Sequence, residues 1–197
     1  MMSPRLAATT FTKLVILAAV LFLGTAALLS AQAGWKPLKD RGYSFSYPSD
    51  WNCIDMGGDD YGGTKGYLKA LSPMGETNFV IVIMLFPQFS LDLSSNKLTY
   101  EDFIKMVFES ALDASDQEGG KIEKTEAALS HGQVPAFMLI KEESEKSFKA
   151  SLICGDLVNG NAAIIMVTLA LSGDDVENGK DYLDKAEQIM ASFAFPK

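Results

Sequence analysis

The sequence has 197 residues, of which 48% are hydrophobic and 21% are charged, and this ordinary globular composition excludes a chain that is mainly disordered. The formal net charge at pH 7 is −8. Because phosphate backbones and anionic membrane surfaces repel such a chain, the charge excludes nucleic acid as an expected partner. Partners are expected to be proteins, cations or neutral ligands.

The N-terminal segment has the layout of an export signal. It contains Arg5 and Lys13, no acidic residue, and an apolar run from Leu14 to Leu29. Small residues occupy the positions before Ala33 that a signal peptidase requires. The sequence therefore predicts a signal peptide over residues 1–33, which contacts the membrane only transiently, and a periplasmic or secreted location for residues 34–197.

An uncleaved membrane anchor is the alternative interpretation of the same segment. The run from Leu14 to Leu29 includes Gly24, and it is shorter than the roughly 20 residues that cross a bilayer. A lipoprotein would need a cysteine after the cleavage site, where this chain has Gly34. Cleavage is therefore the favoured interpretation. Because cleavage removes Arg5 and Lys13, it would take the net charge from −8 to −10.

Residues 34–197 form a single expected domain, because no repeat or long linker divides them. Alternation of aromatic residues and serine over Tyr43–Tyr47 predicts a half-buried strand. A second strand is expected at Tyr67–Leu71. Two further strands, Phe79–Phe86 and Ala162–Leu171, are apolar on both faces, so we expect the sheet to be covered on both sides.

Two helices are predicted. Thr99 and Asp102 have the spacing of a capping box, and the apolar residues after them repeat with helical periodicity, which predicts a helix over residues 100–115. The same periodicity from Tyr182 to Phe193 predicts a second helix that faces the core.

Three more strands are expected between the helices, at Lys121–Leu129, Ala136–Glu142 and Ser147–Cys154. His131-Gly132 separates the first two, and Asn159-Gly160 is a strong hairpin signal after the third because both residues tolerate positive φ. The element order predicts an α+β fold: a mainly antiparallel β-sheet with helices packed on its faces.

Three segments resemble the PsbP/DcrB-like superfamily. The stretch from Gly42 to Trp51, an aromatic strand that runs into Pro and then Trp, is similar to its opening strand. Ile189–Phe193 resembles its closing helix, and Gly132–Ala136 resembles a turn before one of its middle strands.

The resemblance implies an α/β/α sandwich around an antiparallel sheet. The superfamily includes extrinsic subunits of the oxygen-evolving photosystem, bacterial envelope lipoproteins, and a nuclear factor that binds the small GTPase Ran. Most members act as binding or assembly modules. This chain lacks the lipidation cysteine, and its residues match neither the photosystem-binding nor the Ran-binding surface.

Cys53 and Cys154 would both meet an oxidising compartment after export. A bridge between them would close a loop of about 100 residues and stabilise the fold by roughly 4–5 kcal/mol on chain-entropy grounds. Two buried free thiols are the equally weighted alternative, since cysteine is among the residues most often found in cores.

His131 is the only histidine, so any hydrolase mechanism of the Ser-His-Asp type would depend on it. Its setting between Ser130 and Gly132 is typical of a polar turn. We therefore assign no catalytic residue and expect no enzymatic activity, with a hydrolase as the weakest of the functional hypotheses.

The Gly-rich acidic stretch from Asp55 to Gly66 is the most unusual part of the domain. A phosphate-binding loop is disfavoured, because a strand and not a helix follows it and the order of its last residues is Gly-Thr-Lys. Calcium binding is a minor alternative, since the ligand spacing of a calcium loop and its closing Glu are absent. We interpret Asp55, Asp59, Asp60 and Tyr61 as a flexible surface loop that is available for binding.

The leading functional hypothesis is an exported, non-enzymatic binding or assembly module of the cell envelope, with an envelope protein as its partner and no cofactor or metal. Contacts are expected at the stretches 55–66 and 87–98. A carrier of a hydrophobic small molecule is the alternative, suggested by the many aromatic and methionine residues expected near the junction of sheet and helices, and it requires a closed apolar pocket.

Overall fold

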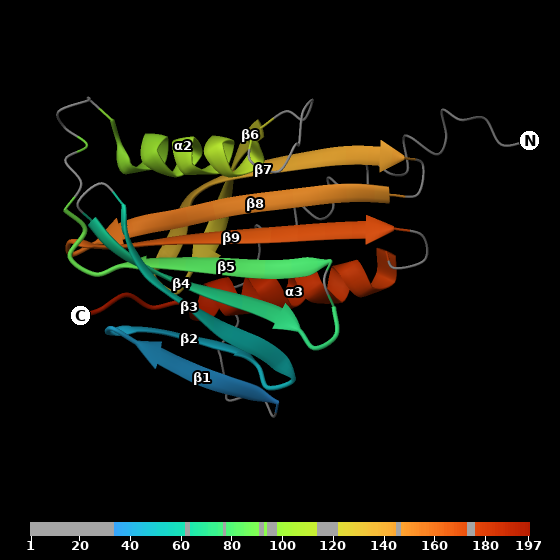
Figure 1. Ribbon diagram of the computed structural model, residues 1–197, viewed down its shortest axis with the longest axis horizontal. Coiled ribbons are helices and arrows are strands. Elements are labelled where there is room, and N and C mark those ends of the chain that lie inside the picture. Colours follow the sequence, from blue (N-terminus) through green and yellow to red (C-terminus); the bar gives the residue numbers. More distant parts are fainter. Residues whose placement is uncertain are drawn as a thin grey trace, which may run out of the picture.

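The computed structural model describes residues 34–61, 64–76, 78–90, 93, 98–113, 122–144, 147–172 and 176–197 (Figure 1). Residues 1–33, to which the predicted signal peptide belongs, lie outside the described residues. Within the described ranges, no helix combines the length and the apolar character that crossing a lipid bilayer requires.

Over the described residues, the chain forms strands and two helices in the order of an α+β protein, which confirms the predicted fold class. The elements are β1 (Trp35–Asp40), β2 (Tyr43–Pro48), β3 (Trp51–Tyr61), β4 (Thr64–Pro73), β5 (Phe79–Phe86), α2 (Tyr100–Asp113), β6 (Ile122–Leu129), β7 (Gly132–Ser144), β8 (Ser147–Val158), β9 (Asn161–Ser172) and α3 (Val176–Ser192). All strand pairs are antiparallel.

Most strands belong to one seven-stranded sheet with the order β3-β4-β5-β9-β8-β7-β6, and β1 and β2 form a separate two-stranded sheet. The predicted hairpin at Asn159-Gly160 is confirmed: the two residues have φ of 51° and 74° and connect β8 to β9. Arg41 and Gly42, with φ of 49° and 87°, make a second two-residue turn of the same kind between β1 and β2.

One face of the large sheet is covered over its central strands. Alternate residues of β5 and β9 on this face, from Phe79 to Leu85 and from Ala163 to Leu171, are buried in a cluster that also contains side chains of α3 and the β1–β2 hairpin. Trp51 and Tyr182 pack their rings against Phe79, with centroids 5.4 and 5.3 Å from the Phe79 centroid. This aromatic layer is the main core of the domain.

The opposite face is covered over only part of its width. Helix α2 packs Phe103, Ile104 and Phe108 against β7 and β8 in a smaller cluster. In Figure 1, α2 lies beside β7 and β8 while α3 lies on the other side of the sheet. Val80 and Val82 of β5 are therefore only half-buried on the α2 face, and the predicted cover of the central strands is less complete on this face than on the α3 face.

The predicted helix start is confirmed in atomic detail. The Thr99 backbone N–H and hydroxyl both donate to Oδ2 of Asp102, at 2.8 and 2.7 Å, and the Asp102 N–H donates back to the Thr99 hydroxyl at 3.1 Å. This reciprocal pair satisfies N–H groups that the first helical turn leaves without partners. Helix α2 therefore begins where the sequence places it.

Two strands were not predicted from the sequence. Strand β1 has little alternation of polar and apolar residues, and β3 contains glycines and aspartates that are depleted in strands. The prediction of a flexible loop from Asp55 to Tyr61 was wrong, because these residues continue β3 and pair with β4.

The structure has free thiols at Cys53 and Cys154 and no bridge between them. Cys53 lies on β3 and Cys154 on β8, and four spacings in the sheet order separate these strands. At about 4.8 Å per spacing, the Cα atoms are roughly 19 Å apart, whereas bridged cysteines have Cα atoms within about 7 Å. The hypothesis of a disulfide is therefore wrong for this fold.

We predict that both thiols react when the protein is denatured and alkylated without a reductant, and that reductant does not increase the number of modified sites. Intact mass gives the count directly. In the native state Cys154 should stay unmodified, because it is buried, donates to Sδ of Met190 at 3.7 Å, and has a pKa that burial raises to about 12. A protein that shows no free thiol until it is reduced would contradict this account.

Glu187, an acidic residue of helix α3, is half-buried. Partial burial, together with the charge of Asp184, raises its pKa from 4.5 to about 7. The folded state therefore binds the proton of the Glu187 carboxyl more tightly than the unfolded chain does. The stability that this proton contributes is fully present below pH 4.5 and is lost as the pH rises to about 7.

We predict that Glu187→Gln raises the melting temperature above pH 7 and has little effect near pH 4.5. The neutral amide removes the cost of ionising the carboxylate at high pH, whereas at low pH the native carboxyl is already neutral. Thermal melts of both proteins from pH 4 to pH 8 measure the difference. Melting curves that differ by the same amount at every pH would contradict the assignment.

Candidate functional site

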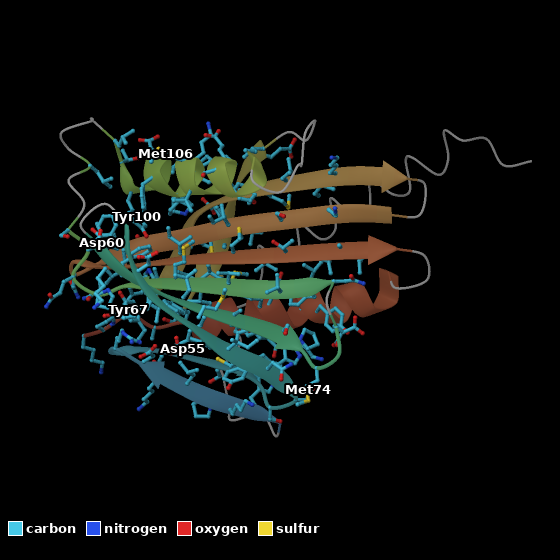
Figure 2. All side chains as sticks on the ribbon, in the orientation of Figure 1. Asp55, Asp60, Tyr67, Met74, Tyr100 and Met106 are labelled. Atoms are coloured by element: carbon cyan, nitrogen blue, oxygen red, sulfur yellow. The ribbon has the colours of Figure 1, made fainter. Side chains whose placement is uncertain are left out.

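The candidate site is the outer part of the β3–β4 hairpin at one edge of the sheet. Every residue from Ile54 to Asp60 is exposed, although all of them belong to β3. Figure 2 shows Asp55 and Asp60 along this strand, with Tyr67 on the neighbouring β4. The structure thus brings the predicted Asp55, Asp59, Asp60 and Tyr61 together on one edge strand.

The glycines of the hairpin have structural roles. Gly57 lies at a register shift of β3 against β4 and has φ of 85°, a conformation that disfavours other residues. The carboxylate of Asp55 accepts a hydrogen bond from the Gly57 N–H at 2.9 Å. The Gly-rich composition therefore encodes a β-bulge, and no helix N-terminus follows it to bind phosphate.

Gly58 makes room for an aromatic ring. It lies directly opposite Tyr67, and a Cβ atom at Gly58 would come within 2.6 Å of the Tyr67 ring. On this ring Arg41 places its guanidinium carbon 3.5 Å from the centroid, which is a cation–π contact. The Tyr67 ring thus joins the turn between β1 and β2 to the β3–β4 hairpin.

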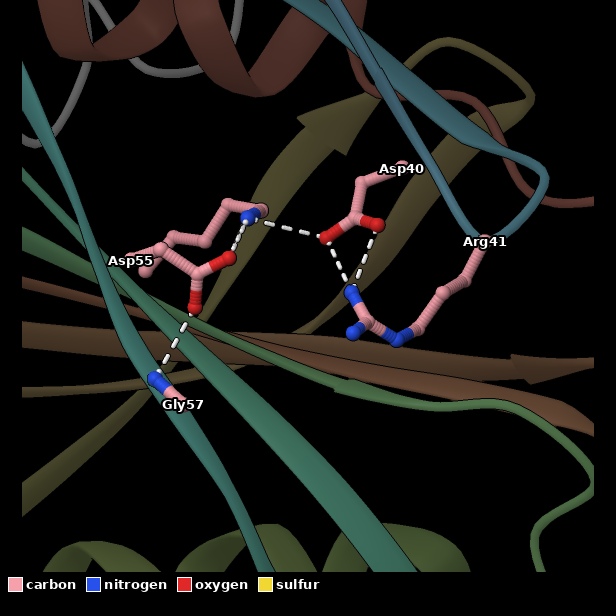
Figure 3. Close-up of polar contacts among 5 residues, drawn as sticks. Asp40, Arg41, Asp55 and Gly57 are labelled. Atoms are coloured by element: carbon pink, nitrogen blue, oxygen red, sulfur yellow. Dashed lines mark hydrogen bonds and ion pairs between the residues drawn. The ribbon is translucent and has the colours of Figure 1, made fainter.

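Lys69 joins the same two hairpins through charge (Figure 3). Its Nζ atom lies 2.9 Å from Oδ2 of Asp40 and 2.9 Å from Oδ2 of Asp55, and the lysine side chain is only 7% exposed. Asp40 also accepts two hydrogen bonds of 2.6 Å from Arg41. We call Asp40, Arg41, Asp55, Tyr67 and Lys69 the clamp.

The charges of the clamp shift the pKa values of Asp55 and Lys69. The hydrogen bond with Lys69, followed by that from the Gly57 N–H, lowers the pKa of Asp55. Burial pulls the pKa of Lys69 down, but its hydrogen bonds to Asp40 and Asp55 outweigh burial and raise it. The clamp is therefore a charged, mutually neutralising group and not a proton-transfer site.

The hairpin is not arranged to bind calcium. Asp55 is already paired with Lys69, and Asp59 accepts a hydrogen bond from the Asp60 N–H at 2.8 Å. Asp59 and Asp60 are consecutive strand residues, so their side chains point to opposite faces. In the part of the chain that the structure describes, no cluster of three or more His, Cys, Asp or Glu side chains is placed to hold a metal ion.

His131 lies in the turn between β6 and β7, as its neighbours in the sequence predict. Its Nε2 atom is 2.8 Å from a carboxylate oxygen of Asp156, and its ring meets Phe195 edge-on at 5.2 Å. The Ser130 hydroxyl donates to the Phe193 carbonyl at 2.5 Å instead of to the imidazole. No nucleophile of a Ser-His-Asp type is therefore assembled among these residues.

The sequence pattern missed an open apolar row on the α2 face. The row has one residue on each of six neighbouring strands, and each residue is paired in register with the next. In order across the sheet they are Phe137, Ile153, Met166, Val82, Ala70 and Ile54. Phe137 and Ile153 are buried near α2, the next three are half-buried, and Ile54 is 56% exposed at the β3 edge. The row thus becomes progressively more accessible toward the candidate site.

The second predicted contact stretch, residues 87–98, is described only in part. Phe89 packs against Tyr100 and Phe103, with ring centroids 5.6 Å apart in both cases. Residues 91, 92 and 94–97 lie outside the described residues. The described part of the stretch therefore contributes an aromatic side chain to the cluster beneath α2.

Comparison with known proteins returns similar structures only. No protein-family model matches the sequence, and no curated protein matches it at a significant level. The structure is similar to the solution structure of cyanobacterial PsbP (CyanoP) from Synechocystis sp. PCC 6803, with 17% identity, a TM-score of 0.47, and coverage of 88% of this chain and 98% of that chain.

Two further structures are similar. A protein from Bacteroides thetaiotaomicron VPI-5482 has 15% identity and a TM-score of 0.43, over 79% of this chain and 46% of that one. LpqN, which is involved in cell envelope biogenesis of Mycobacterium tuberculosis, has 11% identity and a TM-score of 0.39, over 83% and 91% of the two chains.

We predict that Lys69→Met lowers the free energy of unfolding by about 1–3 kcal/mol, because it leaves Asp40 and Asp55 without their shared cation. Lys180→Met is the control: Lys180 is an exposed lysine on α3, away from the clamp, and its loss should change stability by no more than about 0.5 kcal/mol. Urea denaturation measures both. Equal losses in the two variants would show that the clamp does not hold the hairpins together.

Proposed function

We propose that this protein is an exported, non-enzymatic binding or assembly module of the cell envelope, with an envelope protein as its partner. The observation that carries the proposal is the unequal cover of the sheet. Monomeric soluble proteins rarely leave contiguous apolar surface open unless it is an interaction site. The row that ends at Ile54 is such a surface, and it adjoins an exposed edge strand.

Three other features support the proposal. The basic and apolar pattern of residues 1–33 favours export to a periplasmic or secreted location. Helices α2 and α3 belong to clusters on opposite faces of the sheet, which supports the α/β/α sandwich of the PsbP/DcrB-like superfamily. The hydroxyl of Ser130, the neighbour of His131, donates to the Phe193 carbonyl and not to the imidazole, which supports a function without catalysis.

The alternative of a small-molecule carrier is weaker, because the side chains that suggested it contact one another. Trp51, Phe79 and Tyr182 pack together on the α3 face. Phe89 packs with Tyr100 and Phe103 on the α2 face. These rings pack the helices against the sheet, so they do not line a pocket for a ligand.

Site-specific photo-cross-linking tests the proposal in the cells that produce the protein. We predict that a photoreactive residue at Ala70 or Val82 yields a discrete adduct with another exported protein, because both positions lie in the open row. A photoreactive residue at Lys180, which is exposed on α3, should not give that adduct. The adducts are compared on gels and identified by mass.

A substitution then links the adduct to the open row. Ile54→Lys places a charge at the exposed end of the row and should abolish the adduct without unfolding the protein. Met74→Lys is the matched control, since Met74 is an exposed apolar residue outside the row, and it should leave the adduct unchanged. The proposal fails if the same products arise from Ala70, Val82 and Lys180, or if Ile54→Lys has no effect.

A further inference from the structure

We infer that β6 pairs with β6 of a second copy of this chain, in an antiparallel register centred on Thr125, so that the two seven-stranded sheets join into one. The dimer goes beyond the proposed function, because it uses the edge of the sheet opposite the candidate site and a different partner. Such a dimer has twofold symmetry, so every contact occurs twice and the edge must be complementary to itself.

Strand β6 is a regular terminal strand. It ends the seven-stranded sheet and pairs with β7 from Ile122 to Leu129 without a register shift. Strand β3, at the other edge, has a bulge at Gly57, and its Gly57 and Asp60 N–H groups donate to its own aspartates. The β6 edge therefore keeps the regular spacing of backbone groups that pairing with another strand requires, whereas the β3 edge does not.

The backbone groups that point away from the sheet can be followed from strand to strand. The Ala170 N–H donates to the Asn78 carbonyl at 2.7 Å, so the even-numbered residues of β9 bond to β5 and the odd-numbered ones to β8. Through the registers of β9, β8 and β7, the odd-numbered residues of β6 then bond to β7. The β6 residues whose N–H and C=O groups point to the outer edge are therefore Ile122, Lys124, Glu126 and Ala128.

The outer backbone groups of these residues have no hydrogen-bond partner in the part of the chain that the structure describes. Farther along, the Ser130 N–H donates to the Phe193 carbonyl at 3.4 Å, so the residue that follows α3 covers the edge beyond Ala128. An open edge strand is a template for pairing with another strand. The open edge of β6 therefore runs from Ile122 to Ala128.

The charges of β6 select one register. When β6 pairs with itself, a register centred on Lys124 would place two lysines opposite each other, and one centred on Glu126 would place two glutamates opposite each other. The register centred on Thr125 instead places Lys124 of each copy opposite Glu126 of the other. It also places Ile122 opposite Ala128. Because opposite charges across a strand pair are stabilising and like charges are destabilising, the Thr125 register is favoured.

The remaining side chains fit the same register. Thr125 meets Thr125 of the second copy at the twofold axis, and threonine pairs across strands exchange hydrogen bonds. Glu123 lies opposite Ala127, so no like charges face each other. Lys124 already pairs with Glu101 of α2 at 2.6 Å, and in the dimer it would lie between Glu101 and Glu126 of the second copy. A lysine at an edge opposes strands that bring no acid to it, so the edge is selective.

The helices leave room for the second copy. Helix α2 packs on β7 and β8, so the α2 helices of the two copies would be separated by at least three strand spacings, about 14 Å. Helices in contact lie about 8–10 Å apart. The net charge of −8 on each copy opposes association, and one strand pair buries less surface than a permanent dimer interface. We therefore expect a weak, reversible dimer.

Sedimentation velocity tests the dimer with the protein purified after expression of the full chain, at concentrations from about 1 μM to about 1 mM. We predict that the sedimentation coefficient rises with concentration from that of a monomer to that of a dimer. Lys124→Glu and Glu126→Lys should each weaken the dimer at least about tenfold, because each turns two opposite-charge pairs into like-charge pairs. Lys180→Glu is the control: it makes the same charge change as Lys124→Glu at an exposed position of α3 and should leave the dimer intact.

Mixing the two variants tests the register itself. In an equimolar mixture of Lys124→Glu and Glu126→Lys, each strand pair again brings glutamate opposite lysine, so a heterodimer should form at concentrations at which each variant alone is monomeric. Thermal melts of both variants confirm that they are folded. Failure of the mixture to dimerise would overturn the register.

A cysteine at the twofold axis gives an independent readout. Thr125→Cys places two thiols opposite each other in a pair with Cα atoms about 4.5 Å apart, within the range of a disulfide. Mild oxidation should therefore produce a covalent dimer linked through residue 125, identified by peptide mass. Lys180→Cys, on the exposed side of α3, should give no such product.

A protein that stays monomeric over the whole concentration range would overturn the inference, as would a dimer that Lys124→Glu and Lys180→Glu affect equally. Covalent dimers in equal yield from Thr125→Cys and Lys180→Cys would do the same. The cross-links from Ala70 and Val82 report on other strands of the sheet. The dimer and the proposed function can therefore fail independently of each other.

Discussion

The burial of two central strands is the constraint on which the rest of the structure depends. Strands β5 and β9 are apolar on both faces and lie next to each other in the middle of the sheet, so both faces must be removed from water for the sheet to be stable. Helix α3 and the aromatic β1–β2 hairpin meet this requirement on one face. On the other face α2 covers only β7, β8 and part of β9 and β5. The apolar row from Met166 to Ile54 is therefore left accessible on this face.

The clamp follows from the same constraint. A two-stranded hairpin is marginal by itself in water, and β1 and β2 share no ladder with the large sheet. Their attachment comes from the burial of Tyr43, Phe45 and Tyr47 in the core and from Lys69 and Tyr67, which bind the turn at Asp40 and Arg41. Aromatic burial supplies most of the attachment, and the lysine bridge fixes its position beside β3.

Much of the fold follows from local patterns in the sequence, because those patterns act over short range. The helix cap at Thr99 and Asp102 and the hairpin at Asn159-Gly160 each depend on a few neighbouring residues. Strands β5 and β9 are recognised from an uninterrupted run of apolar residues. Strand β3 could not be predicted in this way. Its glycines and aspartates disfavour a strand when taken alone, and only its pairing with β4, the Tyr67 ring opposite Gly58 and the charge of Lys69 make it extended.

The conformation of the candidate site could not be predicted for the same reason. The sequence predicted a flexible acidic surface loop at Asp55, Asp59 and Asp60, with calcium binding only as a minor alternative, whereas these residues belong to an edge strand in which consecutive side chains point to opposite faces. The side chains of Asp59 and Asp60 therefore point away from each other, and the carboxylate of Asp55 is held by Lys69, so the acidic composition of the segment reflects its place on an edge strand and in the clamp.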